Sequence, residues 1–207
     1  VKIGAVENVQ GISWTSLTIK GQANHAGTTP MNMRIDAGYA ASMLAVKVRE
    51  ITKEIGGVQV GTVGVITPKP NLINVVPSEV KMTVDLRNVD EEKLKKSEHL
   101  FKVAIKEICD QEGVIIETEE LARFEPVKFD QDLVEIVMNT AKEMNLSVKK
   151  MNSGAGHDAQ MMARICPAAM IFVPSKDGIS HNPKEHTDVS DLKAGAEVLF
   201  NVIKKLE

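Results

Sequence analysis

Hydrophobic and polar side chains alternate most regularly over residues 80–87, where apolar residues take every even position. A period of two predicts a strand with one face on a core and the other in water. Asp85 and Arg87 fall on the wet face. Residues 12–22 are rich in β-branched side chains and predict another strand, with a phase slip after Trp14 that is typical of a β-bulge.

Two long segments have the 3.6-residue period of amphipathic helices. Asp36 begins the first, which ends at Gly56, and Asp90 caps the second, which ends at Gly113. Further strands are predicted over residues 59–67 and 114–121. The resulting order, β-α-β-β-α-β, is the ferredoxin-like pattern, for which we expect an antiparallel sheet with both helices on one face.

After Phe124 the pattern changes to strand, loop and helix in the α/β style, but with only two or three strands. The expected elements are a helix from Asp130, a short strand over 146–150, a helical stretch over 159–164, a buried strand over 168–173 and a final helix over 188–206. The side chains that this final helix is expected to bury are Leu192, Ala196, Leu199, Ile203 and Leu206.

Composition excludes several classes of function. The 207 residues carry 25 basic and 28 acidic side chains, a net charge of −3, which gives no electrostatic signal for nucleic-acid binding. No apolar run approaches membrane-spanning length, and Val1–Gly4 does not have the pattern of a signal peptide. Cys109 and Cys166 lack CxxC spacing, so we expect both to be buried in cores and the protein to be cytoplasmic.

Three polar residues in the first part of the chain are candidates for binding or catalysis. His25, in a loop after the first predicted strand, could donate a hydrogen bond to an oxyanion, although most loop histidines are simply solvated. Arg87 could bind a carboxylate through its fork of N–H groups, or pair with Asp85. Asn74 is compatible with substrate binding and with turn formation.

Two loops in the second part are further candidates. Ser153, Gly154 and Gly156 precede a helical stretch, where backbone N–H groups would suit an anionic group, but a plain tight turn is equally compatible. His157 and Asp158 follow as a polar pair or cap. The loop 178–187 contains His181, the strongest metal-ligand candidate, with Glu185 and His186, which could equally cap the next helix. From spacing alone, no complete metal site can be assembled.

Two long motifs then indicate a family. Residues 21–31, GQANHAGTTPM, continuing to Arg34 and Asp36-Ala37, resemble a motif of the N-carbamoyl-L-amino-acid hydrolases and allantoate amidohydrolases, in the dinuclear zinc-peptidase superfamily. Residues 153–159, SGAGHDA, with 171–175 and 178–187, resemble the same family's C-terminal signature. The resemblance covers essentially the whole chain.

The resemblance implies an α/β catalytic domain with two divalent metal ions (Zn, Mn, Co or Ni), interrupted by a ferredoxin-like lid that also forms a homodimer. Residues 1–10 would end an N-terminal catalytic segment, 11–124 would be the lid, and 125–207 the C-terminal part of the catalytic domain. His181 matches the last metal ligand. The residues that match substrate-binding positions are His25, which also polarises the carbonyl, Asn74, Arg87, Ser153, Gly154 and Gly156.

The other metal ligands and the general base of the family would all precede Val1. The chain is therefore interpreted as the second half of such an enzyme, with at most one weak metal site, and is expected to be inactive alone. In the parent family a metal-bound hydroxide would attack the ureido carbonyl of an N-carbamoyl amino acid or allantoate. The alternatives are a non-catalytic dimerising lid, or an aminoacylase or dipeptidase of the same superfamily.

Overall fold

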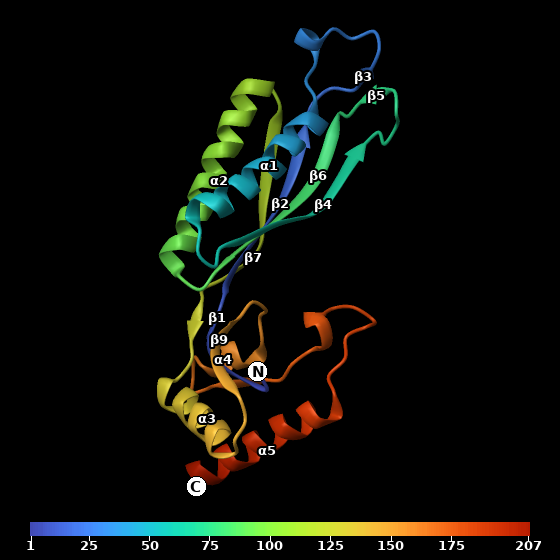
Figure 1. The fold of residues 1–207 in the computed structure, drawn as a ribbon. Helices are drawn as coiled ribbons and strands as arrows, with labels where there is room; N and C mark the ends of the chain where they lie inside the picture. The colour runs from blue at the N-terminus through green and yellow to red at the C-terminus, as the bar shows by residue number, and fades with distance from the viewer. The chain divides into compact units, whose positions relative to one another are not determined.

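The computed structural model describes all 207 residues and divides into two compact units (Figure 1). Unit 1 combines Val1–Gln10 with Val127–Glu207, and unit 2 is Gly11–Pro126. None of the helices combines the length and the apolar character needed to cross a membrane. Each unit has its own hydrophobic core, so the chain pattern changes where one core ends and the other begins.

Unit 2 contains a four-stranded antiparallel sheet with the order β4-β6-β2-β7. Its strands are β2 (Gly11–Lys20), β4 (Val60–Lys69), β6 (Glu79–Asn88) and β7 (Ile115–Phe124). This order and the helices between the strands confirm the ferredoxin-like prediction. The register of β2 against β7 shifts between Trp14 and Thr15, which confirms the predicted bulge.

Both helices of unit 2 pack on the same face of this sheet, as predicted (Figure 1). Helix α1 (Ala37–Ile55) is capped by Asp36, whose side chain accepts from two backbone N–H groups, and α2 (Glu91–Glu112) is capped in the same way by Asp90. The core between helices and sheet contains every apolar residue on the inner face of β6: Val80, Met82, Val84 and Leu86.

A short two-stranded ribbon extends from the end of the unit 2 sheet. It consists of β3 (Asn24–His25) and β5 (Val75–Val76), and we call it the tip ribbon. A 3₁₀ turn, η1 (Met31–Met33), follows β3 and leads back to α1. The tip ribbon was not predicted, because two-residue strands give no periodic signal in a sequence.

Unit 1 is built around β1 (Ile3–Val9), which pairs in parallel with β9 (Val148–Ser153) and antiparallel with two short strands. These are β8 (Val127–Lys128) and β10 (Met170–Phe172). The helical elements of unit 1 are α3 (Gln131–Glu143), α4 (Asp158–Met162), the 3₁₀ turn η2 (Lys176–Gly178) and α5 (Val189–Leu206). Strand β10 is shorter than predicted and only half-buried, so the expectation of a buried strand over 168–173 was wrong.

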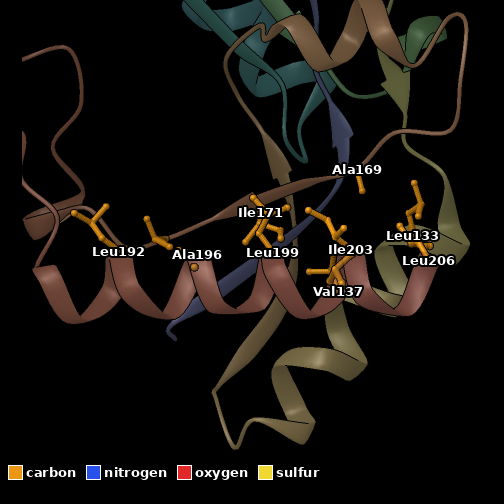
Figure 2. Close-up of a pocket in the computed structure, with 12 residues that line it drawn as sticks. Leu133, Val137, Ala169, Ile171, Leu192, Ala196, Leu199, Ile203 and Leu206 are labelled. Atoms are coloured by element: carbon orange, nitrogen blue, oxygen red, sulfur yellow. The ribbon is translucent and has the colours of Figure 1, made fainter.

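The predicted buried face of α5 is also wrong. The side chains that α5 buries are Asp191, Ala194, Val198 and Val202, whereas Leu199 is 51% exposed. Leu192, Ala196, Leu199, Ile203 and Leu206 instead line an open apolar groove of about 440 Å³ with residues of α3 and β10 (Figure 2). The helix has two adjacent apolar stripes, and the one with Ala194, Val198 and Val202 belongs to the core of unit 1.

The cysteines are both free, and neither is fully buried. Cys109 is partly buried in α2, whereas Cys166 is exposed after α4. The expectation that both are buried in cores was therefore wrong, because neither belongs to the core of its unit.

Candidate functional site

The tip ribbon brings His25 and Asn74 together. His25 pairs with Val75 across the ribbon, and the N–H of the next residue, Ala26, donates to the carbonyl of Asn74 at 2.9 Å. Asn74 is therefore held one residue from the position opposite His25. Two candidates that lie almost 50 positions apart in the sequence thus become neighbours at the end of unit 2.

The hydrogen bonds of His25 define which ring nitrogen carries the proton. Its Nδ1 accepts from the backbone N–H groups of Gly27 at 3.0 Å and Thr28 at 3.2 Å. A nitrogen that accepts two hydrogen bonds has no proton of its own, so the neutral ring carries its proton on Nε2. Because His25 is exposed, this N–H is a donor with a fixed direction and access to a ligand.

The hairpin that carries Asn74 is anchored at its base. The N–H of Ser78 donates to the carbonyl of Lys69 at 2.8 Å, and Lys69 forms an ion pair with Glu79 at 2.9 Å. The hydrogen bond from Lys69 lowers the pKa of the Glu79 carboxyl. These contacts close the loop between β4 and β6, so that the position of Asn74 depends on the sheet rather than on the loop alone.

Arg87 lies far from the tip ribbon in the same unit. It is eight positions from Glu79 along β6, which corresponds to about 26 Å at about 3.3 Å per residue. Its guanidinium pairs with Asp85 at 2.7 and 2.9 Å and lies 5.8 Å from the centre of the Trp14 ring. Arg87 therefore forms the ion pair with Asp85 that was the alternative to a role in binding. It does not meet His25 within one copy.

The loop of Ser153, Gly154 and Gly156 is largely occupied with its own hydrogen bonds. Buried Ser153 accepts through Oγ from the N–H of Ala155 at 3.3 Å and donates to its carbonyl at 2.8 Å. The N–H of His157 donates to Gln160 Oε1 at 3.2 Å. Helix α4 has only five residues, so its dipole adds little to any attraction for an anion.

His181 lies in an exposed turn in unit 1 with a positive φ of 54°. Its backbone N–H donates to Glu185 Oε2 at 2.9 Å, and His186 Nε2 lies 3.4 Å from Asp188 Oδ1. No three His, Cys, Asp or Glu side chains of the chain gather closely enough to hold a metal ion. These 207 residues do not fit a two-metal centre by themselves, because His181 has no convergent partners.

Two residues near His25 that sequence reasoning left without a role are Thr29 and Arg34. The guanidinium of Arg34 donates to the carbonyls of Ala26 at 2.6 Å and Thr29 at 3.1 Å. The hydroxyl of Thr29 donates to the carbonyl of His25 at 2.7 Å. A signal was available, because Arg34 is the only charged residue between Gly21 and Ile35.

A family model decides which proteins this chain is related to. The model described as peptidase family M20/M25/M40 matches residues 15–205. The chain belongs to this family. The match includes the whole tip ribbon, Thr29, Arg34 and the loop that carries His181.

Curated relatives within this family confirm the resemblance based on the two motifs. The chain is 37% identical to an N-carbamoyl-L-amino-acid amidohydrolase of Paenarthrobacter aurescens, over all of this chain and 50% of the relative. It is also 37% identical to the allantoate amidohydrolase of Escherichia coli strain K12, over 99% of this chain and 50% of the relative. The chain thus spans about half the length of the curated relatives it matches.

Solved structures give the same result for the fold. An amidase of the hydantoinase/carbamoylase family from Burkholderia multivorans superposes with a TM-score of 0.93 and 36% identity, over 97% of this chain and 49% of that chain. The mixed α/β architecture, with a ferredoxin-like sheet in one unit, is therefore that of amidohydrolases of this family.

Proposed function

We propose that this chain binds and positions a small ureido substrate in an amidohydrolase that cleaves a linear C–N bond. The substrate would be an N-carbamoyl-L-amino acid or allantoate, as the names of its relatives suggest. The observation that carries the proposal is the tip ribbon, which joins the backbones around His25 and Asn74 and holds His25 by Nδ1, so that Nε2 carries the ring proton. A ureido group offers a carbonyl oxygen to such a donor.

The chemistry of His25 follows from its fixed tautomer. Its Nε2–H would donate to the ureido carbonyl oxygen and stabilise the negative charge that develops when the carbonyl is attacked. Because backbone N–H groups hold Nδ1, the ring needs no reorientation during this step. Asn74 would contribute its amide to the same substrate, and Arg87 would bind a carboxylate.

Two divalent metal ions, which the resemblance implies for such hydrolases, would supply the activated water. His181 is the one residue of this chain that we propose as a metal ligand, and the loop of Ser153, Gly154 and Gly156 as a contact for the substrate. The chain's residues do not form a two-metal centre, so further ligands have to come from other polypeptide. The roles we assign to this chain are therefore binding, orientation and stabilisation of charge.

We also propose that two copies of unit 2 associate through strand β4. One edge of the sheet, β7, carries Glu117, Glu119 and Glu120, and charges of this kind protect an edge from pairing. The other edge, β4, has no charged residue from Val60 to Pro68, and Val65 on it is 46% exposed. An unprotected edge of this length is suited to pairing with a second copy.

Antiparallel pairing of two β4 strands would bring distant residues to one place. Val60 lies opposite Arg87 at one end of the sheet, and Lys69 lies opposite Glu79 at the other end, beside the tip ribbon. In the antiparallel pair, Val60 of one copy would lie near Lys69 of the second copy. Arg87 of the first copy would thus lie at the same end of the joined sheet as His25 and Asn74 of the second copy. Within one copy, Arg87 and these two residues lie toward opposite ends of the sheet.

A chimera tests this proposal. In it, these 207 residues replace the matching half of the Paenarthrobacter aurescens relative, and hydrolysis of N-carbamoyl-L-amino acids and of allantoate is measured side by side. We expect hydrolysis of at least one substrate, a loss on the order of 100-fold with His25→Ala, and no loss with His99→Ala, an exposed histidine of α2. A folded chimera without hydrolysis would favour a non-catalytic dimerising unit.

A further inference from the structure

The segment after His25 turns tightly around the histidine. Three consecutive N–H groups point at it: those of Gly27 and Thr28 bind its ring nitrogen, and that of Thr29 binds its carbonyl at 3.2 Å. A Cβ on Gly27 would lie 3.3 Å from His25 Cε1, so a larger residue would press on the ring. The turn is therefore shaped to fit one position of the imidazole.

The carbonyl groups of the same turn point the other way, toward Arg34. Its Nη2 binds the Ala26 carbonyl and its Nε binds the Thr29 carbonyl, so one planar guanidinium fixes both ends of the turn. Charged donors make hydrogen bonds about twice as strong as neutral ones. Thr29, which is 7% exposed, adds its hydroxyl bond to the His25 carbonyl from inside the turn.

The base of this loop is also fixed, so the backbone next to Arg34 is held in place. The N–H of Gln22 donates to the carbonyl of Ile35 at 2.8 Å. A Cβ on Gly21 would lie 2.2 Å from that carbonyl oxygen, so the close approach requires glycine. The side chain of Arg34 thus starts at the closed base of the loop and binds the carbonyls of the turn after His25.

We propose that Arg34, assisted by Thr29, is a positioning residue that holds His25 in its Nε2–H tautomer with a fixed ring direction. It acts through the backbone of residues 26–29: two carbonyls are held by the guanidinium, and the N–H groups on the opposite side are thereby aimed at Nδ1. Only the catalytic consequence of this inference rests on the proposed function of His25. The tautomer itself is a property of the chain.

The test is ¹⁵N NMR of the imidazole rings in the labelled 207-residue chain, with His25 assigned by comparison with His25→Gln. We expect a single Nε2–H form in the unaltered protein. Arg34→Met should convert it into a mixture of both tautomers and remove the protection of the Gly27 and Thr28 amides from hydrogen exchange. Arg49→Met, a change at an exposed arginine of α1, should leave both readouts unchanged.

A second pair of variants keeps the test decisive if Arg34→Met does not fold. Thr29→Val removes the hydroxyl bond and should also shift the tautomer populations, whereas Thr29→Ser keeps the hydroxyl and should preserve the single form. An unchanged Nε2–H signal in folded Arg34→Met, or in Thr29→Val, would overturn the proposal. Failure of the catalytic role is a separate result: the His25→Ala chimera would turn over normally, while the chain that keeps His25 would still show the single Nε2–H form.

Discussion

The hydrogen bond from the N–H of Ala26 to the carbonyl of Asn74 joins the loop after β2 to the hairpin between β4 and β6. It places His25 and Asn74 side by side, although neither residue is near a periodic element that would fix its position from sequence. Arg87, the third candidate in unit 2, lies toward the other end of β6, about 26 Å along that strand from Glu79. Substitutions at Arg87 and at His25 therefore test different parts of the proposed site.

The β4 edge should control association. Replacing Val65 by Lys introduces a charge on the unprotected edge and is expected to convert dimers into monomers in analytical ultracentrifugation. Leu121→Lys is the matched control, since Leu121 is similarly exposed, at 51%, but lies on the opposite edge strand β7. Equal dissociation of both variants would argue against pairing through β4.

The two stripes of α5 should respond differently to substitution. Val198 has no exposed surface, and Val198→Ala is expected to lower the free energy of unfolding by about 2 kcal/mol, because it removes two buried methyl groups. Leu199→Gln, at the neighbouring half-exposed position, should change it by less than about 0.5 kcal/mol. Urea unfolding followed by circular dichroism measures both values. A larger loss for Leu199→Gln would mean that the apolar groove is covered.

The helix caps offer a test of local stability in unit 2. Asp36 accepts hydrogen bonds from the N–H groups of Gly38 at 2.8 Å and Tyr39 at 3.0 Å, so Asp36→Ala should cost about 1 kcal/mol. Asp188 stands at the same position before α5, but its side chain makes no cap hydrogen bond, and Asp188→Ala should cost less. Thermal unfolding of both variants gives the comparison, and equal losses would contradict the assigned difference.

The sequence predicted unit 2 well because its elements are long and each has one buried face. The six buried positions of α1, from Ala37 to Ile51, recur with the helical period that the sequence shows between Asp36 and Gly56. Asp90 and Gly113 mark the ends of α2 as expected, since capping is a local property of the backbone.

Unit 1 was harder to predict, because its sheet consists of short strands around β1 and its final helix has two apolar stripes. Periodicity identifies an apolar face but not the partner that covers it, so the pattern predicts that α5 buries the stripe with Leu199, whereas the structure buries the stripe with Val198. The same limit applies to the site: pairing in the tip ribbon and the contacts of Arg34 are tertiary features. The long motifs indicated the family, but not which residues meet.

We propose that one substrate is held by His25 of one copy and Arg87 of the other. The most direct measurement is the activity of a mixture in which His25→Ala and Arg87→Ala versions of the chimera are co-expressed in equal amounts. Each variant alone should be nearly inactive. Random mixing makes half of the dimers mixed, and one of the two sites in each mixed dimer is intact, so we expect recovery of about a quarter of the unaltered activity. No recovery, with mixed dimers confirmed by mass, would contradict it.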